Sequence, residues 1–434
     1  EKEYGESTVC KILDLVQHAT TKKAVAENFI TKFSKVYTPI VVILALIIAI
    51  VPSFILKIGT PYEWIYRALT FLVISCPCAI AISVPLSYFS GIGKSSKSGI
   101  LIKGSDYLDA LKNIKEIAFD KTGTLTKGTF IVDKIILADE TKYSYPLNKE
   151  GKEKCAEILK YAAYAEHYSS HPVATSVKNA YIDEIDESKI LDLHEIAGKG
   201  VMCKVDGKEV CVGNEKFINE KVEIKKADNS KTTLYVAVDR KYIGRIAITD
   251  EIKEDSKKAI EMLRKEGVSN IVMLTGDKKE AADKVGKEIN IDKIYSELLP
   301  ADKVAKVEEL LNNKDDSKAL AFVGDGINDS PVLKRADIGI SMGGVGSEAA
   351  IEASDIVLMS DDLSKIPKAI NISKYTNFII KQNLSFAIFI KLAILLLSIL
   401  GLANMWFAVF ADTGVTLLTI LNTLRIRKKH TNIY

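Results

Sequence analysis

Residues 116–126 read EIAFDKTGTLT, and this stretch gives the clearest indication of the fold. A short apolar segment ends in Asp120, and a turn rich in Gly and Thr follows at once. In open α/β sheets, ligands bind beyond the carboxyl ends of the strands. An Asp in that position can attack a phosphoryl group and form an acyl phosphate. The stretch therefore predicts a phosphoryl-transfer site at Asp120.

Two later segments repeat this arrangement of an apolar strand followed by polar residues. Residues 270–274 (NIVML) precede Thr275-Gly276-Asp277, and residues 319–323 (ALAFV) precede GDGIND at 324–329. Between them stands Lys303, a cation that can hold a phosphate oxygen. Carboxylates, a hydroxyl and a lysine at three strand ends indicate Mg²⁺-dependent phosphoryl transfer.

Long uncharged runs lie near both ends of the chain. Residues 36–56 and 68–93 carry no charged side chain, and residues 382–424 carry only Lys391 and Asp412. A membrane-spanning helix needs about 20 mostly apolar residues. We therefore expect four spans, at about 36–57, 67–92, 378–400 and 404–424. Four such runs are rarely found together as the core helices of a soluble protein.

The basic residues that flank these runs predict the orientation, because cytoplasmic flanks are rich in Lys and Arg. One side holds Lys57 and Arg67. The other side holds Lys32, Lys35, Lys94, Lys97, Lys103, Lys374, Lys381, Arg425, Arg427, Lys428 and Lys429. We expect the richer side, with both termini and the polar insert between about 94 and 377, to be cytoplasmic. The predicted location is the cell membrane, with the lipid bilayer as a partner.

The overall composition excludes several other classes of protein. The chain has 434 residues, with 59 Lys and Arg against 56 Asp and Glu. Such an even balance does not favour nucleic acid as a partner. An apolar content of 47% excludes a disordered chain. Six cysteines in this length make no disulfide framework, and we expect Cys155, Cys203 and Cys211 to be packing residues.

The second apolar run contains Cys76-Pro77-Cys78 near its middle. Pro77 removes a helical hydrogen bond and opens the local backbone. Cys76 and Cys78 can then offer thiolates to a soft metal ion. Lys391 and Asp412 also fall near mid-depth, and charges inside a membrane are usually paired. We expect Asp412 to ligate the ion and Lys391 to meet Asp412 as a built-in counter-ion.

The motifs DKTGTLT at 120–126, TGD at 275–277 and GDGINDSP at 324–331 resemble those of the P-type ATPases, ion pumps that pass through an aspartyl phosphate. The resemblance implies that Asp120 is phosphorylated, that Thr275 and Lys303 hold the phosphate, and that Asp120, the Thr122 carbonyl and Asp325 bind Mg²⁺. The implied catalytic residues are Asp120, Lys121, Thr122, Thr275, Gly276, Asp277, Lys303, Asp325, Asn328 and Asp329.

Thr122 separates this chain from related phosphatases of the haloacid dehalogenase type. Those enzymes carry a second Asp two positions after the nucleophile, as a general acid and base. Here the position is Thr122. Without that group the acyl phosphate should hydrolyse slowly, as a pump requires.

The insert at about 129–247 contains a pattern that resembles the ATP pocket of heavy-metal P-type ATPases. That pattern is a Glu five residues before His-Pro, then Gly-x-Gly, then Gly-Asn. The resemblance implies that His171 contacts the adenine, that Glu166 orients it, and that two glycines let the backbone approach the nucleotide. The implied ATP-binding residues are Glu166, His171, Pro172, Gly198, Gly200 and Asn214.

The membrane segments resemble the zinc, cadmium and lead subgroup, as in the cadmium-resistance exporters of Gram-positive bacteria. The resemblance rests on Cys76-Pro77-Cys78, NLSFAIFIK at 383–391 and ADTGVTLLTILN at 411–422. Two thiolates and one carboxylate suit a divalent ion such as Zn²⁺ or Cd²⁺. The residues do not choose among Zn²⁺, Cd²⁺ and Pb²⁺.

The predicted fold is a multi-domain membrane protein. A helical bundle of four spans carries an α/β, haloacid-dehalogenase-like phosphorylation domain with a doubly wound parallel sheet, and an α+β nucleotide-binding domain is inserted in it. The expected segments are a lead-in (1–35), two spans (36–93), the first phosphorylation part (94–128), the nucleotide domain (129–247), the second phosphorylation part (248–370), two spans (371–426) and a tail (427–434).

The resemblance also implies an N-terminal part that precedes these residues, with an actuator domain and further spans. We therefore expect this chain to bind ATP and to be phosphorylated, but not to complete a transport cycle by itself. The leading hypothesis is ATP-driven export of Zn²⁺ and Cd²⁺. The alternatives are a monovalent copper pump, a membrane-anchored phosphatase, and a remnant that binds metal without turnover.

Overall fold

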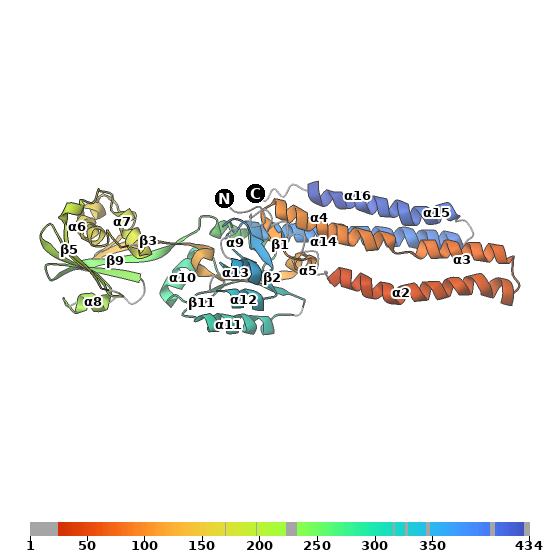
Figure 1. Ribbon diagram of the computed structural model, residues 1–434, viewed down its shortest axis with the longest axis horizontal. Coiled ribbons are helices and arrows are strands. Elements are labelled where there is room, and N and C mark those ends of the chain that lie inside the picture. Colours follow the sequence, from red (N-terminus) through yellow and green to blue (C-terminus); the bar gives the residue numbers. More distant parts are fainter. Residues whose placement is uncertain are drawn as a thin grey trace. The chain divides into compact units, whose positions relative to one another are not determined.

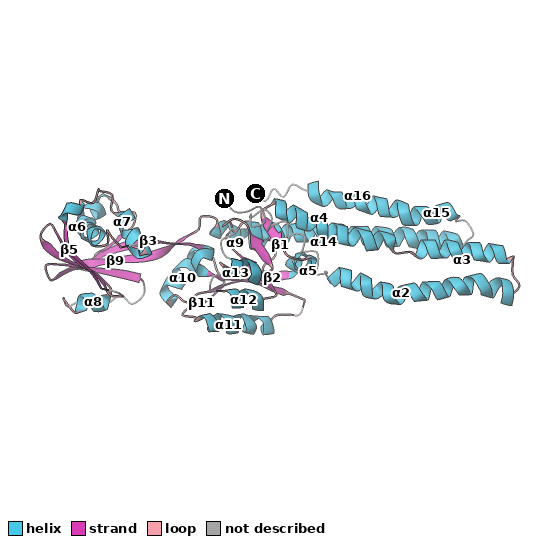
Figure 2. Cartoon of the chain, viewed as in Figure 1, coloured by secondary structure: helices cyan, strands magenta, loops and turns pink. Residues whose placement is uncertain are grey.

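The computed structural model describes most of the chain. The described residues are 25–169, 171–196, 198–222, 232–315, 317–325, 329–343, 348–399 and 404–428. These residues form two compact units, and each is described here by itself. The first unit holds the residues up to Ala118, Glu261–Asn270 and those from Val304 onward, and the second holds Phe119–Ile260 and Ile271–Lys303. Figure 2 distinguishes their helices from their strands.

The first unit contains a bundle of long helices (Figure 1). The bundle helices are α2 (Val25–Ile50), α3 (Pro61–Ser75), α4 (Cys78–Lys97), α14 (Lys365–Ile399), α15 (Met405–Val409) and α16 (Val415–Lys428). Two short π-helical turns belong to this bundle. Val51–Ile55 continues α2, and Phe410–Gly414 joins α15 to α16.

Four helical segments of the described chain are long and apolar enough to cross a membrane, as predicted. They are Lys35–Ile55, Pro61–Lys97, Lys365–Leu397 and Met405–Lys428. The second to fourth segments are longer than expected because their helices continue into polar ends. Helix α2 already begins at Val25, so the last part of the predicted lead-in belongs to the same helix as the first span. The rest of the lead-in and the predicted turn at 401–403 lie outside the described residues.

Small side chains allow the bundle helices to approach closely. Ala79, Ala387 and Val415 form one buried contact group. Ile74 and Ile394 form another with Ala408 and Ala411. Large apolar side chains such as Ile43 and Leu396 point outward and are exposed. This distribution is typical of helices that pack through small residues and face lipid with large ones.

The first unit also contains strands that pair in the order β1-β14-β13-β12. Strands β12, β13 and β14 are parallel, and β1 is antiparallel to β14. Helix α12 connects β12 to β13, and α13 connects β13 to β14, as the predicted α/β domain requires. The strands are β1 (Ile100–Ile102), β12 (Ala319–Gly324), β13 (Ile338–Ser341) and β14 (Ile356–Leu358), and the helices are α5 (Ser105–Ala110), α12 (Ser330–Arg335) and α13 (Glu348–Ala353).

Four elements contribute residues to both units: β2 (Ile114–Asp120), α9 (Ser256–Lys265), β10 (Asn270–Leu274) and α11 (Pro300–Asn313). Strand β2 is buried from Ile117 to Asp120, because both of its faces are covered. The strands predicted at 116–120, 270–274 and 319–323 are all present, as β2, β10 and β12.

The second unit contains a seven-stranded antiparallel sheet in the order β4-β3-β9-β8-β7-β6-β5. It also contains the parallel pair β10 and β11 with α10 between them. The sheet strands are β3 (Thr126–Leu137), β4 (Lys142–Ser144), β5 (Ile190–Ile196), β6 (Gly200–Val205), β7 (Lys208–Gly213), β8 (Thr232–Val238) and β9 (Lys241–Ile252). The other elements are α6 (Lys149–Ala165), α7 (Pro172–Ala180), α8 (Glu215–Asn219), β10 (Asn270–Leu274), α10 (Lys279–Glu288) and β11 (Lys293–Tyr295).

Alternating side chains place a core on each face of the antiparallel sheet. Val210 and Val212 of β7 pack on one face with α6 and α7, whereas Cys211 packs on the other face with Phe217 of α8. This alternation is the two-residue period of a strand covered on both faces. The predicted bounds of the insert, 129 and 247, fall inside β3 and β9, which run on without a break.

Candidate functional sites

The helix that carries the two membrane cysteines is broken between them. Helix α3 ends at Ser75 and α4 begins at Cys78, so Cys76, which has an extended backbone, and Pro77 form a non-helical link. Pro77 has no N–H to donate, which stops the helical hydrogen-bond ladder at this point. The break was predicted from Pro77, and it leaves carbonyl groups of the last turn of α3 without helical partners.

Side chains from two other helices satisfy these carbonyl groups. Lys391 Nζ on α14 donates to the Ile74 carbonyl at 3.1 Å and also to that of Cys76. The Tyr37 hydroxyl on α2 donates to the Ser75 carbonyl at 2.9 Å. Unsatisfied carbonyls are costly in an apolar bundle, so these donors stabilise the broken conformation.

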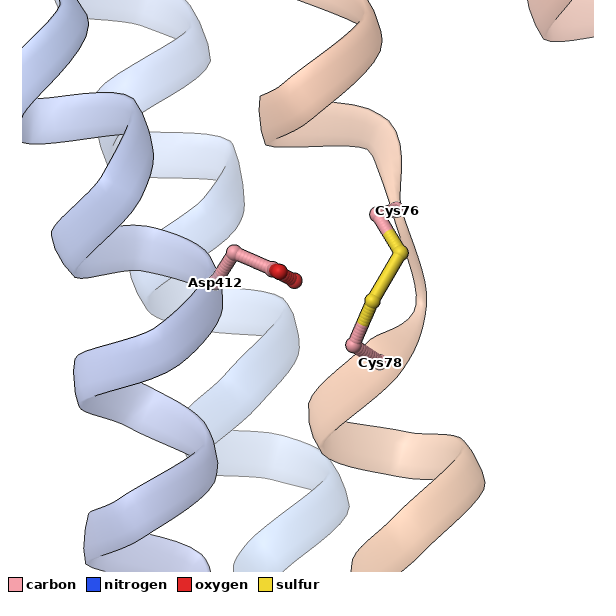
Figure 3. Close-up of side chains that lie close together, drawn as sticks. All are labelled: Cys76, Cys78 and Asp412. Atoms are coloured by element: carbon pink, nitrogen blue, oxygen red, sulfur yellow. A yellow bond between two sulfur atoms is a disulfide. The ribbon is translucent and has the colours of Figure 1, made fainter.

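Asp412 lies beside the break, on the wide turn that joins α15 to α16. Its carboxylate points toward the two cysteine side chains (Figure 3). One ligand atom from each of Cys76, Cys78 and Asp412 lies within 4.8 Å of the others. A tetrahedral zinc site with bonds of about 2.0–2.3 Å needs ligands this close. The Lys391 Nζ is 3.6 Å from Asp412 Oδ1, so the predicted meeting of these two charges is present.

The two cysteines were expected as thiolates, and here the structure differs. Cys76 and Cys78 are joined in a disulfide. A disulfide sulfur is a poor metal ligand, because the thiolate is the ligating form. Metal binding by this cluster therefore requires the two-electron reduction of the bond to two thiols and the release of their protons.

Asp120 ends strand β2 in the second unit and is buried. Lys303 Nζ on the first turn of α11 donates to Asp120 Oδ1 at 2.5 Å. Gly123 in the turn that follows has φ of +72°, a conformation that favours glycine. The turn therefore leaves the strand sharply, and the predicted nucleophile and the predicted phosphate-binding lysine are in direct contact.

Lys121 points to a different pair of carboxylates. Its Nζ forms ion pairs with Asp277, and with Asp250 at 3.4 Å. Asp250 also accepts a hydrogen bond of 2.5 Å from the Thr126 hydroxyl. Lys121 is buried, so this network holds the turn after β2 against the ends of β9 and β10.

A cleft of about 320 Å³ opens beside this network in the second unit. Four predicted residues line it: Lys121, Thr122, Gly276 and Asp277. Thr275 is buried, and its hydroxyl accepts a hydrogen bond from the Asp277 N–H at 3.1 Å. The cleft offers cations, a hydroxyl and carboxylates to a phosphorylated ligand.

Two more predicted carboxylates belong to the first unit. Asp325 directly follows β12, and Asp329 is buried immediately before α12. The Gly324 carbonyl accepts from Met342 N–H at 2.8 Å, which ties the end of β12 to the residue after β13. Asn328 lies outside the described residues.

The predicted nucleotide residues fall into two groups in the second unit. Glu166 is buried at the end of α6, whereas His171 and Pro172 are exposed at the start of α7. His171 Nδ1 accepts a hydrogen bond of 3.2 Å from Val173 N–H, so its ring caps α7. Lys178 holds the segment between the two helices by donating to the carbonyls of His167 and Ser169 at 3.0 Å each.

The second group is built around a close approach of two strands. Gly200 and Gly213 are partners in the β6–β7 pair, and a Cβ on Gly200 would lie 2.2 Å from the Val212 carbonyl oxygen. The Asn214 amide donates to the Gly198 carbonyl at 2.9 Å, and its oxygen caps α8 at Phe217. The close approach therefore requires glycine at position 200, whereas Gly198 lies in open space with φ of +71°, a conformation that favours glycine. Asn214 tethers the loop that contains both glycines.

Burial raises the pKa of Glu166, and the charge of Glu195 raises it further, whereas a hydrogen bond from Ser169 opposes the change. Because the folded state then binds this proton more tightly, the free energy of unfolding should fall as the pH rises from the ordinary pKa of 4.5 to the raised value. We expect Glu166→Gln to remove this fall and to stabilise α6 at neutral pH. Amide hydrogen exchange of α6 and β6 across this pH range measures the effect.

The exposed Glu153 on the same helix provides the matched control. Glu153→Gln should leave the pH dependence of exchange in α6 as it is in the unchanged protein. Equal pH slopes in Glu166→Gln and the unchanged protein would contradict the burial argument.

Two contacting residues were missed by the sequence reasoning. Asp250 lies two residues before the end of β9, in the string AITD, and this apolar run followed by Asp resembles the one at Asp120 and was a usable signal. Tyr37 lies in an apolar run, where nothing in the sequence distinguishes it from a packing residue. Cys155 and Cys203 are buried as predicted, and burial raises the pKa of each thiol to about 11.

Comparison with known proteins bears on both sites. Residues 114–337 match the family of haloacid dehalogenase-like hydrolases. The chain is 51% identical over 428 residues to the cadmium, zinc and cobalt-transporting ATPase of Bacillus subtilis (strain 168). It is 47% identical over 428 residues to the zinc-transporting ATPase of Synechocystis sp. (strain ATCC 27184 / PCC 6803 / Kazusa). Each match covers 98% of this chain, but only 59% and 58% of those proteins.

A solved structure gives the same result for the fold. The crystal structure of a zinc-transporting PIB-type ATPase in its E2.Pi state matches with a TM-score of 0.79 and 33% sequence identity. The match covers 98% of this chain and 68% of that chain. The likeness therefore includes the helical bundle as well as the α/β parts.

Proposed function

This chain belongs to the zinc- and cadmium-transporting subgroup of the heavy-metal P-type ATPases, and on that premise we propose that it drives the export of Zn²⁺ and Cd²⁺ with ATP. Of the two relatives described above, one is named for cadmium, zinc and cobalt transport and the other for zinc transport. The observation that carries the proposal is the convergence of Cys76, Cys78 and Asp412 beside a broken membrane helix. Pb²⁺ is a further candidate substrate.

The phosphoryl half of the reaction uses Asp120. A carboxylate oxygen of Asp120 attacks the γ-phosphorus of ATP, a new P–O bond forms, and the bond to the bridging oxygen breaks as ADP leaves. Lys303, which contacts Asp120, would bind a phosphoryl oxygen as negative charge develops. Thr122 supplies no acid or base to activate water, so the acyl phosphate persists long enough to be coupled to transport.

Mg²⁺ fits this half of the reaction by the chemistry of its donors. The carboxylates of Asp120 and Asp325 and the Thr122 carbonyl are the hard oxygen ligands that Mg²⁺ prefers. When bound, the ion would neutralise charge on the transferred phosphoryl group. Asn328, Asp329 and Gly276 complete the catalytic set that we propose.

ATP would bind at the antiparallel sheet of the second unit. The exposed ring of His171 and the buried carboxyl of Glu166 are proposed to contact the adenine. The loop through Gly198 and Gly200, tethered by Asn214, is proposed to lie along the nucleotide. We assign this role to residues from about 129 to 247, and phosphorylation to the α/β parts on either side of them.

In the membrane half, the reduced Cys76 and Cys78 and the Asp412 carboxylate would bind the substrate ion. Binding displaces the Lys391 ammonium from Asp412, and Lys391 keeps its carbonyl partners at the helix break. A carboxylate favours a divalent ion over Cu⁺, which prefers soft sulfur ligands alone. The excess of Lys and Arg on one flank favours a cytoplasmic position for both α/β parts and both termini.

Phosphorylation from ATP labelled in its γ-phosphate tests this proposal. The protein is kept reduced, and Zn²⁺, Cd²⁺, Pb²⁺ or Cu⁺ is added in separate reactions with Mg²⁺ present. We expect Zn²⁺ and Cd²⁺ to raise an acid-stable label that hydroxylamine removes. Stimulation by Cu⁺ alone, or a label that ignores every metal, would overturn the proposed substrate. Steady phosphate release without accumulated label would indicate a phosphatase instead.

A further inference from the structure

A basic pocket lies where α4 and α16 end, apart from both sites described above. These helices run side by side in the first unit (Figure 1). The pocket has a volume of about 250 Å³. Its lining residues are Phe89, Ser90, Gly93, Lys94, Lys97 and Arg427.

The walls of the pocket are held in place by contacts between the two helices. The hydroxyls of Ser87 and Thr423 are 3.1 Å apart and buried. Lys94 Nζ donates to the Arg427 carbonyl at 3.5 Å. A Cβ on Gly93 would meet no atom within 4 Å, so the space above this glycine is open. The pocket is therefore an open space between the ends of α4 and α16, which these contacts hold together.

The charges of this pocket are unbalanced. Three of its six lining residues are cations and none is acidic. In the part of the chain that the structure describes, no carboxylate lies within ion-pair distance of Lys94, Lys97 or Arg427. Other lysines of the same unit do have such partners: Lys112 contacts Asp109 at 2.6 Å, and Lys374 contacts Glu266 at 2.9 Å. Cations also stabilise helix C-termini, but three in one small pocket repel one another unless an anion is present.

The remaining wall of the pocket is apolar. The Phe89 side chain is 54% exposed on α4, two turns before the end of that helix. The pocket lies in the last turns of two candidate membrane spans, Pro61–Lys97 and Met405–Lys428. A cationic end next to an exposed aromatic ring, at the level where a span leaves the bilayer, matches a phosphate head group above an acyl chain.

We propose that this pocket binds the phosphate of an anionic glycerophospholipid. Lys94, Lys97 and Arg427 contact the phosphate oxygens, Ser90 donates a hydrogen bond, and Phe89 packs against the start of an acyl chain. The site rests on the proposed placement of the four helices in a membrane. Because a bound lipid would bridge α4, which begins at Cys78, to α16, which follows Asp412, it would brace the two helices that carry the metal cluster.

Titration of the detergent-solubilised chain with phosphatidylglycerol or phosphatidylcholine, followed by native mass spectrometry, tests the proposal. We expect phosphatidylglycerol to bind the unchanged chain at least about tenfold more tightly. The combined variant Lys94→Gln, Lys97→Gln, Arg427→Gln should lose this preference. The matched control Lys57→Gln, Arg67→Gln, Lys381→Gln removes the same charge outside the pocket and should keep the preference.

A second variant keeps every charge and fills the space instead. Gly93→Leu places a side chain where the pocket is open, and it should also lose the preference. Equal binding of both lipids, equal loss in the matched control, or full displacement by the same concentration of inorganic phosphate would overturn the lipid site. Metal-stimulated phosphorylation is measured on the unchanged chain and on each variant. If the unchanged chain shows no metal stimulation, the proposed function is wrong. If metal stimulation is present but the unchanged chain does not prefer phosphatidylglycerol, only the lipid site is wrong.

Discussion

Asp120→Asn should reduce phosphorylation from ATP by at least about a thousandfold, to below detection. The amide oxygen is a far weaker nucleophile than the carboxylate, and nothing else on the described turn replaces it. The substitution removes only the charge that Lys303 contacts at 2.5 Å, so the fold should be retained. Acid-stable, hydroxylamine-sensitive label measures the result, and ATP binding to the variant checks that the nucleotide residues are intact.

The exposed Asp315 provides a control of the same chemistry. Asp315→Asn should label as the unchanged protein does. Label that persists in Asp120→Asn would mean that another carboxylate accepts the phosphoryl group, and peptide mapping would then examine Asp250 and Asp277, which lie beside Lys121. That result would remove Asp120 from its proposed role.

Asp412→Ala should weaken Zn²⁺ binding by about a hundredfold or more and abolish the metal stimulation of phosphorylation. The variant loses the one carboxylate of the cluster and leaves two thiolates as ligands. Lys391 would remain half-buried without its counter-charge, although it still donates to the carbonyls of Ile74 and Cys76. Competition with a fluorescent zinc chelator measures the affinity, and the labelling assay measures the coupling.

Thr416→Val is the matched control, one helical turn after Asp412. The Thr416 hydroxyl donates to the Asp412 backbone carbonyl at 2.6 Å, so this change leaves the carboxylate itself in place. It should change zinc affinity far less than Asp412→Ala. Equal zinc affinity in Asp412→Ala and the unchanged protein would place the ion elsewhere.

Much of the architecture could be predicted because it depends on local patterns. The strands that end at Asp120, Leu274 and Gly324 follow from short apolar runs before polar turns. The four long apolar helical segments follow from apolar runs of about 20 residues or more, which are rarely found together in a soluble protein. The break at Pro77 follows from the missing N–H of a single residue.

Other features depend on which segments meet, and local patterns contain no such information. The predicted domain bounds fell inside β3 and β9, because a strand continues wherever a partner strand pairs with it. The cysteines predicted as free thiolates form a disulfide, because their link across the helix break brings the two sulfurs together.

By itself, then, the sequence determined the chemistry: a carboxylate after a strand, a Cys-Pro-Cys link and two intramembrane charges of opposite sign. Only the tertiary structure decided how those groups are held. It turned Lys121 toward Asp277 and Asp250 and brought Lys303 to Asp120. It also placed Tyr37 and Lys391 on the carbonyls of the broken helix. The physical reason is that an unpaired carbonyl or a buried carboxylate accepts a hydrogen bond from any donor that packing brings within reach, however far away that donor lies in the chain.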